Sequence, residues 1–212
     1  MVRSDEIMEI AASIMELLFL LSESLLYPAI LLLITLVIGV LVMLGQVISE
    51  YSGRVRDIRR IRDTSRSAHD LIRSNNPVGA ATVISDVPMN GLVKKFIVDL
   101  SGFFTDSEFP LEAEKLLQDY ELIIGKKLEF LKILTRTAPM LGLMGTLIPL
   151  GPALMGLSSG NIDTLTSNLV VAFSTTVLGL LVGGMAYTIM LIRRSWYYQD
   201  FSDMEYIVGI LE

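Results

Sequence analysis

Residues 137–192 read TAPMLGLMGTLIPLGPALMGLSSGNIDTLTSNLVVAFSTTVLGLLVGGMAYTIMLI, and Asp163 is the only charged residue among them. One membrane helix needs about 20 apolar residues to cross the hydrocarbon core, so this stretch is too long for one crossing and suits two. The polar run at 158–163 is rich in turn-forming residues. We therefore predict membrane spans at 137–157 and 165–192.

A third apolar run, free of ionised residues, extends from Leu25 to Ile48 and predicts an earlier span. The residues before it repeat apolar side chains every three to four positions, which predicts an amphipathic helix on the outer membrane surface or packed on neighbouring spans. The expected fold is all-α, with three transmembrane helices. The expected segments are an outer amphipathic helix, span one, a cytoplasmic helical region, span two, an outer turn, span three and a cytoplasmic tail, at 1–23, 24–49, 50–136, 137–157, 158–164, 165–192 and 193–212.

The distribution of basic residues predicts the orientation. Of the 17 Lys and Arg residues, all but Arg3, Arg193 and Arg194 lie between spans one and two. Basic residues are concentrated in cytoplasmic loops, so we expect the central region and the C-terminus in the cytoplasm, and the N-terminus and the short turn outside. This is the pattern of a multi-pass protein of the cell membrane.

The central region is expected to hold long helices and a small core formed by Phe96, Ile97, Leu100, Phe103 and Phe104. A helix that begins at Pro110 should continue into span two. Arginines from Arg54 to Arg66 flank an apolar stripe, and this pattern fits either a positive-inside flank or a surface that binds anionic lipid or a cytosolic partner.

The sequence shows no pattern of residues that is typical of an enzyme active site. It has no cysteine, and no metal-ligand spacing, phosphate-binding loop or nucleophile–base pair is visible. We expect no cofactor, no metal, no nucleic-acid partner and no active site.

Small and hydroxylated residues distinguish spans two and three from passive anchors. Glycines allow close helix packing and prolines bend helices; the residues expected in these roles are Pro139, Gly142, Gly145, Pro149, Pro152, Gly179 and Gly183. The hydroxyls of Thr146, Thr175 and Thr176 either line an ion path or bond to their own helices. Since no carboxylate lies inside a span, any proton carrier must come from another polypeptide.

Two motifs resemble signatures of the MotA/TolQ/ExbB proton-channel family. Residues 138–146, APMLGLMGT, are similar to its A-P-x-x-G-L-x-G-T signature, and residues 169–180, LVVAFSTTVLGL, resemble its second signature. The predicted layout is closest to the ExbB/TolQ branch. The resemblance implies a ring, typically a pentamer, around a single-span partner of ExbD, TolR or MotB type whose membrane Asp faces Thr146 and Thr176. Such a ring couples proton or sodium flow to mechanical work.

Three residues, in spans two and three, depart from the family pattern. Val171 stands where many ExbB and TolQ chains carry Glu, which leaves sodium open as the ion. Pro149 and Pro152 should kink or loosen the outer half of span two. Two other functions are compatible with the sequence, namely a stand-alone hydroxyl-lined pore and a membrane scaffold that conducts no ions.

Overall fold

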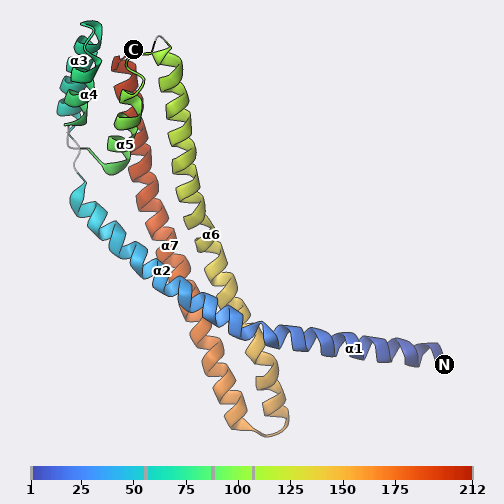
Figure 1. Ribbon diagram of the computed structural model, residues 1–212. Coiled ribbons are helices and arrows are strands. Elements are labelled where there is room, and N and C mark those ends of the chain that lie inside the picture. The colour runs from blue at the N-terminus through green and yellow to red at the C-terminus, as the bar shows by residue number, and fades with distance from the viewer. Residues whose placement is uncertain (1, 55–56, 87–88, 107, 212) are drawn as a thin grey trace. The chain divides into compact units, whose positions relative to one another are not determined.

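The computed structural model describes residues 2–54, 57–86, 89–106 and 108–211, with side chains from Met8 onward. Over these residues the chain is helical and contains no strand (Figure 1). The helices are α1 Val2–Ser24, α2 Leu26–Gly53, α3 Ile58–Arg73, α4 Pro77–Ser85, α5 Gly91–Ser101, α6 Phe109–Ser158 and α7 Ile162–Leu211. The all-α fold expected from the sequence is confirmed.

Among the residues that the structure describes, three segments are long and apolar enough to cross a membrane, as predicted. They are Met8–Gly53, which contains α2, and the whole of α6 and α7. Helices α6 and α7 have 50 residues each, or about 75 Å at 1.5 Å per residue. Each is therefore about two and a half times as long as a hydrocarbon core of about 30 Å is thick.

The turn between α6 and α7 is shorter than predicted. The sequence prediction covered 158–164, whereas α6 ends at Ser158 and α7 begins at Ile162. Gly160 reverses the chain with a φ of 75°, a conformation that glycine adopts without steric cost. The Asn161 side chain accepts a hydrogen bond from the backbone N–H of Thr164 at 3.1 Å, which caps α7. This capping extends α7 by three residues at its start, and Asp163 lies in its first turn.

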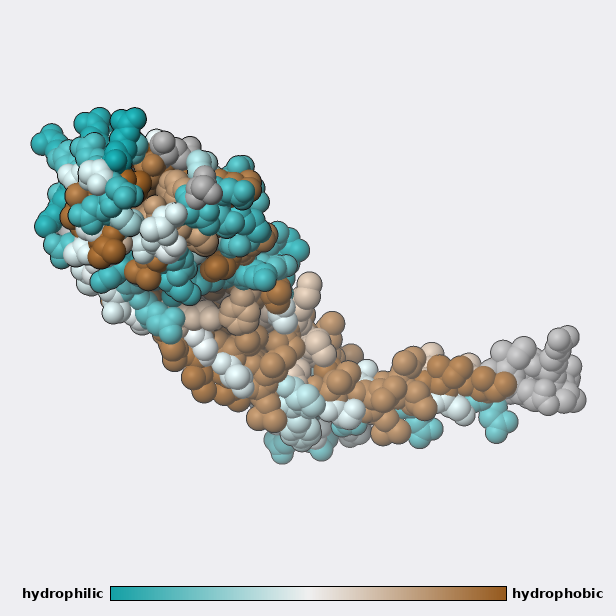
Figure 2. All heavy atoms as spheres, turned by 45° about the horizontal axis from the view of Figure 1, so that its top comes forward, coloured by the Kyte–Doolittle hydropathy of each residue, from teal (hydrophilic) through white to brown (hydrophobic). Residues whose placement is uncertain are grey.

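The described chain forms two compact units. Unit 1 comprises residues 1–44 and 131–188, and unit 2 comprises residues 45–130 and 189–212. In unit 1, Ala29 and Leu33 of α2 pack with Leu141 of α6 in a small apolar cluster. Figure 2 shows hydrophobic side chains over the visible surface of unit 1 and mostly hydrophilic ones around α3 and α4 of unit 2.

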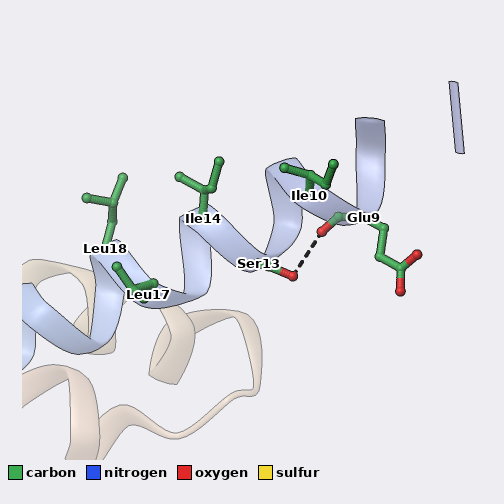
Figure 3. Close-up of a pocket in the computed structure, with 6 residues that line it drawn as sticks. All are labelled: Glu9, Ile10, Ser13, Ile14, Leu17 and Leu18. Carbon is green, nitrogen blue, oxygen red and sulfur yellow. Dashed lines mark hydrogen bonds between the residues drawn. The ribbon is translucent and has the colours of Figure 1, made fainter. Parts of the chain in front are cut away.

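Helix α1 is more apolar than the amphipathic prediction implied. At 100° per residue, Met15 and Phe19 lie away from the predicted face of Ile10, Ile14 and Leu21, and all five side chains are exposed in unit 1. The hollow along α1 is lined by six residues of this helix alone, among them Ile10, Ile14 and Glu9, so it is an open helix surface (Figure 3). Glu9 accepts a bond from the Ser13 hydroxyl through its backbone carbonyl at 3.0 Å.

Unit 2 has its own hydrophobic core, to which each of α3 to α7 contributes. Phe96, Ile97, Leu100 and Phe104 belong to it, as predicted, but Phe103 is only half-buried and does not. Phe103 and Phe104 lie in the turn that follows α5, where only Phe104 is buried in the core.

Aromatic contacts and one polar contact fasten α6 to α5 in this core. Tyr120 packs edge-on against Phe96, with ring centroids 5.2 Å apart. Its hydroxyl donates to an Asp99 carboxylate oxygen at 2.6 Å. Burial and the hydrogen bond to Asp99 raise the pKa of the Tyr120 phenol, so this donor stays protonated throughout the neutral range.

We predict that Phe96→Ala destabilises unit 2 by about 3–5 kcal/mol, because it removes a fully buried ring and leaves a cavity. The measurement is thermal unfolding of the detergent-solubilised protein followed by circular dichroism. Val98→Ala on the same helix is the control, since Val98 is 55% exposed, and its effect should stay within about 0.5 kcal/mol. Equal effects of the two changes would contradict the assignment of this core.

Candidate functional site

The candidate site is built on a glycine-lined contact between α6 and α7 in unit 1. A Cβ atom added at Gly179 would lie 2.8 Å from the Ala138 carbonyl oxygen and 2.8 Å from Gly142 Cα. One added at Gly142 would lie 3.1 Å from the Thr175 carbonyl oxygen. These are backbone atoms, so only glycine at both positions permits this separation of the helices.

The contact extends along both helices on either side of this pair. A Cβ atom added at Gly145 would lie 2.5 Å from the Thr175 side chain, and one added at Gly183 would lie 2.7 Å from the Pro139 ring. The four glycines singled out in the sequence for close packing therefore all line one contact between α6 and α7. The Pro139 ring fills the space that Gly183 leaves open.

The hydroxyls of Thr146 and Thr176 meet across this contact. Their Oγ1 atoms are 3.3 Å apart, with Thr146 on α6 and Thr176 on α7. The Gly142 carbonyl oxygen lies 3.3 Å from each hydroxyl, and Thr146 also donates to the Leu143 carbonyl at 2.8 Å. Both side chains are half-buried. Residues 30 positions apart in the chain thus form one neutral pair of hydroxyls with a shared backbone acceptor.

Thr175 lies in a different environment from its neighbour Thr176. Its side chain is 6% exposed and packs in the glycine contact beside Gly145. Its hydroxyl is 2.9 Å from the Ala172 carbonyl and 3.0 Å from the Val171 carbonyl, both on its own helix. Consecutive positions on a helix face different ways, and Thr175 is not hydrogen-bonded to the Thr146–Thr176 pair in the contacts that the structure describes.

The three prolines of α6 lie inside a continuous helix. Pro139 packs against Gly183, Pro149 is buried and Pro152 is half-buried. A groove beside Pro152 is lined by α6 residues such as Ile148 and by α1 residues including Phe19. The kink expected at Pro149 and Pro152 stays a prediction.

The pair of hydroxyls has no charged neighbour in the spans themselves. The sequence contains no Asp, Glu, Lys, Arg or His at 137–157 or 165–192. Among the described residues there is no group of acidic, histidine or cysteine side chains that could hold a metal ion. The arrangement can accept and donate hydrogen bonds, but it cannot carry a proton as a carboxylate does.

A second polar cluster lies in unit 2 and was not predicted from the sequence. The Arg54 guanidinium, at the residue after the end of α2, forms an ion pair with Asp200 of α7, whose side chain is 2% exposed. Asn90 donates to the same Asp200 carboxylate at 2.8 Å. Arg54 also lies over the Trp196 ring, 4.9 Å from its centroid. Arg54 looked like one member of a basic flank, and only the three-dimensional structure shows its partner 146 residues away.

Nearby side chains extend this cluster toward the end of α2. Arg193 of α7 donates to the Gln46 amide oxygen at 3.3 Å and lies 3.9 Å from Glu50. Tyr197 is buried beside them, and burial raises the pKa of its phenol. These contacts join α2 and α7 within unit 2 through side chains of both charge signs.

The fold and the site together define a helical membrane protein whose paired spans meet at small residues and share a pair of hydroxyls. Residues 102–205 match the model of the MotA/TolQ/ExbB proton channel family. Through this region, which includes both spans and the threonine pair, the chain belongs to that family. The match does not separate the branches of the family, so the ExbB/TolQ placement stays a prediction. No curated protein and no solved structure gives a significant match.

We predict that Gly179→Ala destabilises the α6–α7 pair by about 1–3 kcal/mol, because the added methyl group meets backbone atoms that cannot rotate away. The matched control is Gly184→Ala on the same helix, where an added Cβ has no neighbour within 4 Å. The control should leave thermal stability unchanged or slightly higher, since alanine favours helix more than glycine does. A Gly179 variant as stable as the control would contradict the close contact.

We also predict that Asp200→Ala destabilises unit 2 by about 3–5 kcal/mol, because Arg54 loses its close, buried partner and keeps only Glu50, whose carboxylate lies 3.9 Å away. The comparison is Asp119→Ala, which breaks the exposed Lys115–Asp119 pair of α6 and should cost about 0–1 kcal/mol. Chemical denaturation of both variants in detergent measures the difference. Equal losses would show that the Arg54–Asp200 pair is not buried as described.

Proposed function

We propose that this chain is the ring subunit of an ion-driven membrane motor. The observation that carries the proposal is the Thr146–Thr176 pair, with hydroxyl oxygens 3.3 Å apart on facing spans inside the region that matches the family. Hydroxyls at this position can exchange hydrogen bonds with a group that takes up and releases an ion. The ion is a proton or sodium.

The pair requires a partner, because neither threonine is an ion carrier. The partner that fits is a single-span protein of ExbD, TolR or MotB type that places one Asp carboxylate opposite the hydroxyls. A neutral, hydrogen-bonding surface stabilises that carboxylate without trapping it in an ion pair. Each unit charge that crosses a potential of 100 mV releases about 2.3 kcal/mol, comparable with the strength of a few hydrogen bonds.

Several copies of the chain would surround the partner, in a ring that is typically pentameric in this family. The ring would lie in the cell membrane with unit 2 on the cytoplasmic side, as the basic residues between spans one and two suggest. Thr175 is a packing residue in this proposal, since its hydroxyl is bonded to its own helix and its side chain fills the glycine contact. The site has no catalytic group and uses no cofactor.

Val171 bears on the two alternative functions, a scaffold that conducts no ions and a stand-alone pore. Its side chain is half-buried on α7, at the position where the resemblance leads one to expect Glu. A chain without this carboxylate and without a partner would act as a scaffold or as a hydroxyl-lined pore. Ion flux into liposomes that contain the chain alone, compared with the chain plus its single-span partner, separates these functions from the motor. Separate runs with a pH gradient and a sodium gradient identify the ion.

We predict that Thr146→Val and Thr176→Val each abolish partner-dependent ion flux and leave assembly intact. Valine has nearly the shape of threonine, so the change removes the hydroxyl with little effect on packing. Flux is measured in liposomes that contain the chain and the partner, and assembly is measured by native mass.

Thr188→Val is the matched control on α7. Thr188 is exposed, and its hydroxyl donates to the Gly184 carbonyl at 3.0 Å, so its loss should not change the flux. Thr146→Ser and Thr176→Ser keep the hydroxyl and should keep most of the flux. Normal flux in both valine variants would rule out the proposed role of the pair.

A further inference from the structure

We propose that α3 of one chain binds α6 of a second copy in a head-to-tail contact between arginines and glutamates. The inference rests on the proposed ring and identifies a surface that would close it. The two surfaces are the arginine stripe, defined as Arg59, Arg66 and Arg73 of α3, and the glutamate stripe, defined as Glu114 and Glu121 of α6.

The arginine stripe is exposed along the whole length of α3. Its members are seven residues apart, which places them on one side of the helix about 10.5 Å from each other. Asp63 and Asp70 follow two of these arginines by four residues, but basic-before-acidic order is the weaker arrangement for pairing along a helix. The guanidinium groups are therefore available for bidentate contact with a carboxylate on another chain.

The glutamate stripe has the same spacing on an exposed side of α6. Glu114 and Glu121 are seven residues apart, and both are exposed. Lys115, the basic residue beside Glu114, is paired with Asp119 at 2.6 Å, so it does not neutralise the stripe.

The two stripes belong to helices on opposite sides of unit 2. Helix α3 contacts α7 through a bond from Arg62 Nε to the Tyr206 hydroxyl at 2.9 Å. Helix α6 contacts α7 elsewhere, with Lys127 lying 5.7 Å from the centre of the Tyr197 ring. Within unit 2, α5 and α7 lie between α3 and α6 (Figure 1). One chain therefore cannot join its own two stripes, whereas a head-to-tail contact between copies joins them and can close a ring.

The two stripes lie at matching heights, where height means the position along the axis of α7. Helix α3 runs in the same direction as α7, since Arg62 contacts Tyr206 and His69 lies 3.4 Å from the Leu211 carbonyl oxygen. Arg59 precedes Arg62 by three residues, so it lies near the level of Asp203 on α7. Glu121 lies six residues before Lys127 on the antiparallel α6, which also brings it near the level of Asp203. Rotation about a ring axis parallel to these helices preserves height, so Arg59 of one copy can meet Glu121 of the next.

The same comparison with α7 places Arg66 of one copy at the height of Glu114 of the next. Arg66 follows Arg62 by four residues and lies near the level of Ile210, and Glu114, thirteen residues before Lys127, reaches the same level.

Anionic lipid is a poorer partner than a second copy for the arginine stripe. Tyr206 lies 14 residues beyond Ile192, the end of predicted span three, or about 20 Å along the helix, and salt screens charges beyond about 8 Å.

The test is site-directed cross-linking. The chain has no cysteine, so only the introduced thiols react with the cross-linker. Two singly substituted full-length chains are co-expressed, purified in native-like detergent and treated with a short bismaleimide. A bismaleimide is preferred to a disulfide because an Arg–Glu pair separates Cα atoms more widely than a disulfide permits. The matched combinations are Arg59→Cys with Glu121→Cys, and Arg66→Cys with Glu114→Cys.

We expect covalent dimers from both matched combinations and at least fivefold less from Arg59→Cys with Glu114→Cys, whose heights differ by about 10 Å. Each single variant alone should give no dimer, since a head-to-tail contact does not bring a residue against its own copy. In addition, Glu121→Arg should weaken assembly and Arg59→Glu in the same chain should restore it. Both residues are exposed, so loss of folding does not confuse the result.

Native mass separates the two levels of the proposal. A multimer that gives no cross-link, or equal cross-links from matched and mismatched combinations, overturns this interface and leaves the proposed ring intact. A monomer overturns the ring and the interface together. A dimer from Arg59→Cys alone overturns the head-to-tail arrangement in favour of a two-fold one.

Discussion

The approach of α6 to α7 at Gly142 and Gly179 is the constraint on which the rest of unit 1 depends. Lipid tails are as apolar as leucine, so burial of apolar surface gives membrane helices little reason to associate. Close packing of the backbones supplies the attraction instead, and it requires the absence of Cβ atoms at these positions. The same approach brings the hydroxyls of Thr146 and Thr176 to 3.3 Å. A wider separation would lose the packing and the hydroxyl pair together.

The two units differ in the polar groups that they bury. The spans of unit 1 hold hydroxyls whose hydrogens are taken up by backbone carbonyls such as that of Gly142, so they contain no group that is costly to place in lipid. Unit 2 buries an ion pair, but Arg54 and Asp200 are each supported by further polar or aromatic neighbours. In the proposed motor, a neutral hydroxyl pair suits reversible contact with the carboxylate of the partner, whereas the satisfied ion pair suits a permanent junction.

The features that could be predicted from the sequence are those set by local patterns. Apolar length predicted the three spans, and the glycines of spans two and three predicted close packing. The Arg54–Asp200 pair could not be predicted, because its members are 146 positions apart and each has an ordinary local context. Thr175 and Thr176 show a second limit. Both looked equally suited to a polar path, and only the rotation of α7 against α6 separates the buried residue from the paired one.

Continuity of the two long helices links the hydroxyl pair to the rest of the chain. Neither α6 nor α7 is interrupted over its 50 residues, and a helix transmits a rotation along its axis better than a loop does. Thr176 and Asp200 lie on the same helix, 24 residues apart, so a twist of α7 at the pair must either reach the Arg54 contact or be absorbed between them. Helix α6 has Pro139, Pro149 and Pro152 as places to bend, while α7 has no proline. The helix without proline is therefore the one that carries the charged junction, and in the proposed motor α6 is the one that can adjust to a partner.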